Sequence, residues 1–80
     1  MERRATHRER TDGIGSISID EHSSVGCIVY VVSENGIRVT LPQAEIVPSI
    51  FVLTAPFLGK TFVCEVAWRN DESIGAKFRV

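Results

Sequence analysis

The chain has 80 residues, which is enough for one small domain and not for two. Hydrophobic residues make up 44% and charged residues 24%, the balance of an ordinary globular domain. A formal net charge of −1 provides no general positive field, so we do not expect a protein that coats a nucleic-acid polymer. Positive charge is instead concentrated at the start, where residues 1–10 hold four arginines against two glutamates.

The N-terminal segment differs from the rest of the chain. Residues 1–12 have no apolar periodicity that could pack against a core, so we expect a flexible basic arm there and one folded domain over residues 13–80. Within that domain a first strand is expected over residues 13–20, where Ile17 and Ile19 alternate with serines.

A central hairpin follows. Residues 25–32 are almost entirely apolar and rich in β-branched side chains, which is typical of a strand covered on both faces. The strand ends at the polar tip 33–36, where we expect Asn35 and Gly36 to take the positive φ of a tight reversal. Alternating apolar and polar residues over 37–41 predict the returning strand.

The second half of the chain reads in the same way. In chain order we expect at most one helical turn at 43–46, a strand at 49–54, a loop at 55–60, and a hairpin of strands 61–69 and 73–80. Six short strands predict an all-β, six-stranded antiparallel barrel, because an open sheet would leave two edges with few charges to protect them. Trp68 and Phe78 are expected in its core.

Nothing in the sequence predicts an enzyme, a cofactor or a bound metal. No nucleophile motif surrounds Ser33, and the polar segments around His7 and His22 are typical of the surface. Cys27 and Cys64 lack metal-ligand spacing and are expected to be buried free thiols, which fits a reducing cytoplasm. We also expect no signal peptide and no membrane insertion, because no apolar stretch is long enough.

The N-terminal arginines are the strongest candidates for binding. Arg4 and Arg8 are four residues apart with Arg3 adjoining, and a guanidinium can fork onto a phosphate or onto the O6/N7 edge of guanine. An arm folded back over the barrel could close a pocket against the tip 33–36, suited to a small anionic ligand that carries guanine. The alternative is a solvated basic tail.

At this point the sequence resembles a known family. Arg3-Arg4-Ala5-Thr6-His7-Arg8 looks like the RxxxR signature of PilZ domains, and residues 31–36, Val-Val-Ser-Glu-Asn-Gly, stand where that family has [D/N]xSxxG. Residues 64–69 and 74–78 are similar to its last hairpin, so the likeness covers essentially the whole chain.

The resemblance implies a PilZ-type barrel from a bacterium that binds the second messenger cyclic di-GMP. Arg4 and Arg8 would grip guanine edges and phosphates, with Arg3 as an accessory. Ser33 would hydrogen-bond the ligand, and Gly36 would permit the turn. Ligand binding would draw the arm onto the barrel, and a protein partner would read that change.

One residue departs from the family pattern. Val31 stands where the family has Asp or Asn, and it cannot accept hydrogen bonds from guanine, a loss of about 1–3 kcal/mol at a partly buried site. The alternative function is therefore a degenerate PilZ domain that binds no nucleotide and acts as a protein-interaction adaptor. A third reading, a small nucleic-acid-binding barrel, is disfavoured by the acidic balance. The apolar strands also leave room for a homodimer.

Overall fold

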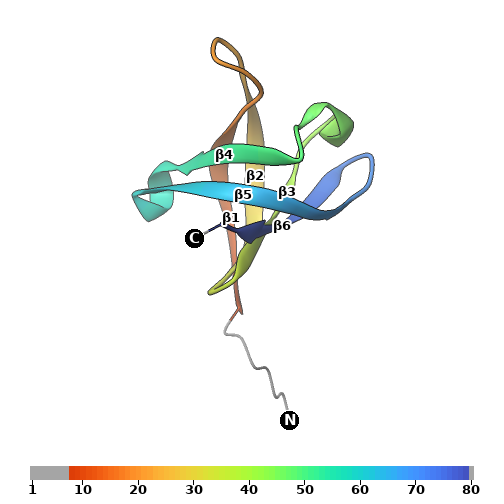
Figure 1. Ribbon diagram of the computed structural model, residues 1–80. Helices are drawn as coiled ribbons and strands as arrows, with labels where there is room; N and C mark the ends of the chain where they lie inside the picture. Colours follow the sequence, from red (N-terminus) through yellow and green to blue (C-terminus); the bar gives the residue numbers. More distant parts are fainter. Residues whose placement is uncertain (1–7, 80) are drawn as a thin grey trace.

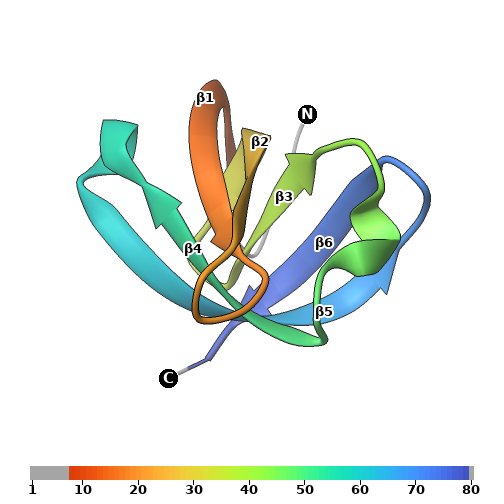
Figure 2. The same ribbon diagram turned by 90° about the horizontal axis from the view of Figure 1, so that it is seen from above.

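The computed structural model describes residues 8–79, with the backbone alone over residues 8–10 (Figure 1). Within this range six antiparallel strands form a closed barrel in the order β1-β2-β3-β6-β5-β4, which confirms the predicted fold class. The elements are β1 (Arg8–Ser18), β2 (Ser24–Ser33), β3 (Gly36–Thr40), η1 (Ala44–Ile46), β4 (Ile50–Ala55), η2 (Pro56–Leu58), β5 (Lys60–Arg69) and β6 (Ser73–Phe78). Both short 3-10 helices lie outside the strands, on different sides of the barrel (Figure 2).

The first strand starts earlier than expected. It was predicted over residues 13–20, but β1 begins at Arg8, and Arg8, Glu9 and Arg10 pair with Ser33, Val32 and Val31 of β2. Backbone hydrogen bonds hold a strand together whatever the polarity of its side chains, so hydrophobic periodicity does not reveal this part. A bulge follows, where Asp12 has a φ of 57° and the Thr11 hydroxyl donates to the Val29 carbonyl oxygen at 2.6 Å.

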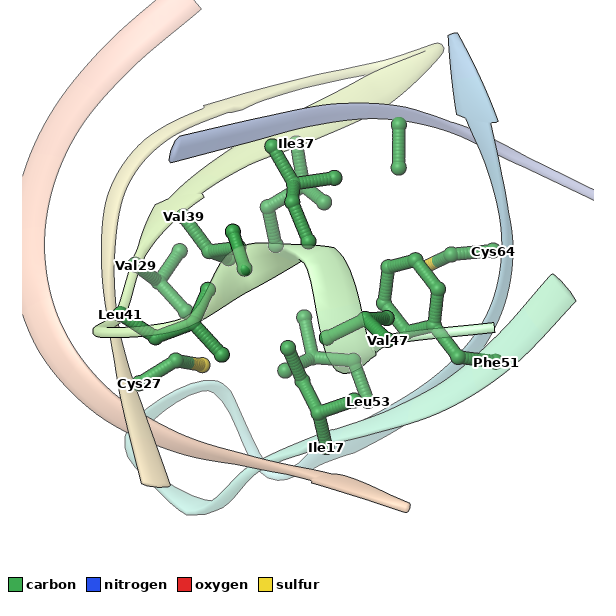
Figure 3. Packing of buried hydrophobic residues seen from close by; sticks show 13 residues of the cluster. Ile17, Cys27, Val29, Ile37, Val39, Leu41, Val47, Phe51, Leu53 and Cys64 are labelled. Atoms are coloured by element: carbon green, nitrogen blue, oxygen red, sulfur yellow. The ribbon is translucent and has the colours of Figure 1, made fainter. Parts of the chain in front are cut away.

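The barrel encloses a core to which all six strands contribute (Figure 3). The buried side chains are Ile17, Cys27, Val29, Ile37, Val39, Leu41, Ala44, Val47, Phe51, Leu53, Cys64, Ile74 and Ala76. Two of them, Ala44 and Val47, come from η1 and the residue after it. The Arg69 guanidinium donates to the carbonyl oxygens of Ala44 and Val47 at 3.1 and 2.6 Å, and so holds this single helical turn against the barrel.

The closure between β1 and β4 is short. These strands pair only at Ser16 with Thr54 and at Ile17 with Leu53. Nearer the start of β1, the ring of Phe57 from η2 lies against Gly13 and fills the space that a Cβ on that glycine would need. An aromatic side chain thus covers β1 where strand pairing stops.

Candidate functional site

The polar tip between β2 and β3 is the first part of the candidate site. Of the residues predicted to bind, Arg3 and Arg4 lie outside the described residues. The backbone of Arg8 pairs with Ser33, so the register brings the arginine-rich segment to the tip. The predicted folding of the arm across the barrel involves residues outside the described range and stays a prediction.

The hydroxyl of Ser33 shapes this tip. It donates to the Gly36 carbonyl oxygen at 3.2 Å and accepts from the backbone N–H groups of Gly36 and Asn35 at 3.1 and 3.3 Å. A hydroxyl has one proton and two lone pairs, so all its hydrogen-bonding capacity is used within the turn. In this state Ser33 therefore positions the tip.

Gly36 is required for close packing and not for its backbone angle. The expectation of positive φ at Asn35 and Gly36 is wrong, because positive φ occurs in the described residues only at Asp12, Gln43 and Gly59. A Cβ at Gly36 would instead overlap the backbone carbonyl oxygen of Ala76 in β6. Gly36 lets β3 and β6 approach each other directly behind the tip.

A row of residues runs from the tip across the outer surface of the barrel. Successive strand pairs put Arg10 opposite Val31, Val31 opposite Arg38, Arg38 opposite Gly75, and Gly75 opposite Trp68. We call these five residues the outer row. Val31 is half-buried and outside the core cluster, whereas its neighbour Val32 packs against that cluster.

Trp68 lies on the surface, so its predicted place in the core is wrong. Its side chain is 42% exposed. The cause is a bulge between Val66 and Trp68, since one extra residue reverses the alternation of inward and outward side chains. Phe78 packs against the core as predicted, and its ring stacks on Phe62 with centroids 4.5 Å apart.

Gly75 and Arg38 define how the tryptophan lies. A Cβ at Gly75 would overlap the indole nitrogen of Trp68, so the indole lies against β6 where that glycine has no side chain. The Arg38 guanidinium carbon is 5.9 Å from the centre of the indole, a cation–π distance. The outer row therefore offers a partly exposed aromatic ring with a positive charge over it.

Two hollows adjoin these features. A pocket of about 380 Å³ beside the tip is lined by Val32, Ser33, Glu34, Leu58, Lys60, Phe62 and Phe78. A shallower apolar groove of about 520 Å³ is lined by Ile14, Gly26, Cys27, Ile28, Thr40, Leu41, Pro42 and Glu72. Ile14 and Ile28 are cross-strand partners, 76% and 45% exposed, so this groove is an apolar area on the outer surface.

The two cysteines are buried free thiols, as predicted. Burial raises the pKa of Cys27 to about 11 and that of Cys64 to about 12, so both thiols stay protonated and unreactive near neutral pH. Among residues 8–79 there is no group of three or more His, Cys, Asp and Glu side chains that could hold a metal ion. Over the same range no helix has the length and apolarity needed to cross a bilayer.

These features are the basis for comparing the chain with known proteins. No protein-family model and no curated protein matches it. Six-stranded barrels occur in unrelated families with different functions, so the fold alone assigns none. The likeness to PilZ domains therefore rests on the sequence motifs.

Proposed function

We propose that this chain is a cyclic di-GMP-binding regulatory barrel of the PilZ type. The observation that carries the proposal is the register of β1 against β2, which puts Arg8 opposite Ser33 and Arg10 opposite Val31. One strand pair thereby joins the arginine-rich segment to the tip and to the outer row. These are the two surfaces that a ligand held by the arm would meet.

The chemistry of these surfaces suits a cyclic purine dinucleotide. Such a ligand carries two phosphates, which arginine binds through paired N–H groups, and two planar bases, which stack on aromatic faces. Trp68 provides an exposed aromatic face, and Arg38 provides a guanidinium beside it. Arg8 at the start of β1, with Arg3 and Arg4 in the arm before it, would supply the remaining positive charge.

The regulatory step in this proposal is the ordering of the arm. A basic segment gains little from lying on the barrel alone, but an anionic ligand bound between them would offset the loss of chain entropy. A protein partner in the bacterial cytoplasm would then recognise the closed surface. The chain would thus act as a signal receptor without catalysing a reaction.

The test is a titration of the full chain with cyclic di-GMP, followed by calorimetry and by the fluorescence of Trp68, which is the only tryptophan. We expect binding and a change in Trp68 emission. Arg4→Ala and Arg8→Ala should each weaken binding about tenfold or more, because each removes a charge-assisted hydrogen bond. Arg79→Ala, an exposed arginine after β6, is the matched control. Equal affinity in all three variants would contradict the proposed role of the arm.

A second candidate function has its own support. Val31 puts an apolar side chain in the outer row between Arg10 and Arg38, and the Ser33 hydroxyl is fully occupied within the tip. Both observations favour an adaptor that binds a protein and no nucleotide, with the groove at Ile14 and Ile28 as an available surface. Absence of heat at high micromolar cyclic di-GMP would favour this adaptor over the receptor.

A further inference from the structure

The outer row contains hydrogen-bond donors and no acceptor side chain among its described members. Val31 and Gly75 have no side-chain polar group. Arg38 has five N–H donors and no acceptor, and the indole of Trp68 is a donor only. The side chains of this row can therefore bind the acceptor atoms of a ligand and offer nothing to its donors.

The position of Arg38 determines which part of a stacked base it could reach. Its guanidinium carbon is 5.9 Å from the indole centre, farther than the ~3.5–4 Å of atoms in direct face contact. The guanidinium therefore lies over the ring without direct face contact, and 42% of Trp68 remains exposed. A base stacked on the open part of the indole would lie beside the guanidinium, with its edge facing the N–H groups.

The two edges of guanine differ in what they present. The O6/N7 edge has two acceptors, which an arginine can bind in bidentate fashion, whereas the opposite edge carries the N1–H and 2-amino donors. With O6 and N7 toward Arg38, these donors point away from it, and no described side chain of the outer row accepts from them. Adenine has a donor at position 6, which would face the donors of Arg38.

We infer that Arg38 is the residue that determines base specificity, reading O6 and N7 of a base stacked on Trp68 while the 2-amino group is left unread. The site would then accept cyclic dinucleotides of any 6-oxopurine, guanine or hypoxanthine alike, and would reject adenine. This inference rests on the proposed function.

The first experiment uses the unaltered chain. Cyclic di-GMP, cyclic di-IMP and cyclic di-AMP are titrated in turn by calorimetry. We expect cyclic di-IMP to bind within about threefold of cyclic di-GMP, and cyclic di-AMP at least about tenfold more weakly. Cyclic di-IMP binding about tenfold or more weakly than cyclic di-GMP would overturn the inference and leave the proposed function standing. Absence of binding by all three would overturn both.

The second experiment substitutes Arg38, the residue proposed to recognise the base. Glutamine can bind adenine at N6 and N7, so Arg38→Gln should weaken cyclic di-GMP about tenfold and remove the preference over cyclic di-AMP. Arg79→Gln makes the same chemical change away from the row and should keep the preference. An unchanged preference in Arg38→Gln, with folding verified by thermal unfolding, would show that Arg38 does not read the base.

Discussion

At the scale of single residues, the position of the Trp68 indole depends on the absence of a side chain at Gly75. The indole occupies the space where a Cβ on that glycine would lie. Both strands are fixed by their pairing, so a larger residue at position 75 must displace the ring and cannot displace the backbone. The aromatic face of the candidate site is thus set by a residue that cannot contact a ligand through a side chain.

This gives a prediction for Gly75→Ala. The added methyl group should push the indole off β6, destabilise the fold by about 1–3 kcal/mol through overpacking, and shift the Trp68 emission maximum. Gly26→Ala is the control, because nothing lies within 4 Å of a Cβ built at Gly26. Fluorescence spectra and urea unfolding measure both effects. Identical spectra in the two variants would show that the indole is not held by Gly75.

At the scale of elements, η1 depends on an arginine from another strand. A three-residue helix cannot satisfy its own carbonyl groups, and the Arg69 guanidinium donates to those of Ala44 and Glu45 in η1 and to that of Val47 directly after it. Because Ala44 and Val47 are buried, this turn also covers part of the core.

Arg69→Met should therefore cost about 1.5–3 kcal/mol of stability, the value of hydrogen bonds from a charged donor, while keeping the length of the side chain. The same change at Arg79, which is exposed, should cost less than about 0.5 kcal/mol. Urea unfolding of the two variants makes the comparison. A similar loss in both would mean that η1 is held by its apolar contacts alone.

The elements also show which parts of the fold and of the candidate site could be predicted from the sequence. Alternating and continuous apolar runs predicted the six strands and the barrel, apart from the polar start of β1, because burial decides which side chains face inward. The bulge before Trp68 was not predictable, since one extra residue leaves the hydrophobic pattern almost unchanged while reversing the side chain that follows. Arg38 and Trp68 were therefore missed as site residues. The one signal in the sequence is a glycine at position 75 inside a predicted strand. Such a glycine often marks a place where another group approaches the backbone closely, as the Trp68 indole does here.

At the scale of the whole molecule, the buried thiols link stability to pH. Burial raises the pKa of Cys27 and Cys64 to about 11 and about 12 from 9.0, so the folded state holds these protons more tightly than the unfolded state. Their contribution is complete below about pH 9 and is lost as the pH rises through the folded-state values.

We therefore expect the free energy of unfolding to fall between about pH 9 and about pH 12. The measurement is urea unfolding at about pH 8 and about pH 10.5, in the unaltered chain and in the Cys27→Ala/Cys64→Ala double variant. The double variant should lose less stability over this interval, because all other groups titrate in both proteins. An equal loss would assign the effect to those other groups.

The short pairing between β1 and β4 has a consequence for how force would travel through the barrel. β1 is bonded to β2 along most of its length, but to β4 only at Ser16 and Ile17. Tension applied at the start of β1 would pass into β2 and on to β3, the strands that bear the tip and Arg38, while β4 stayed largely uncoupled. The barrel thus has one weak seam, between β1 and β4, and tension at the start of β1 would load the side of that seam that carries the tip.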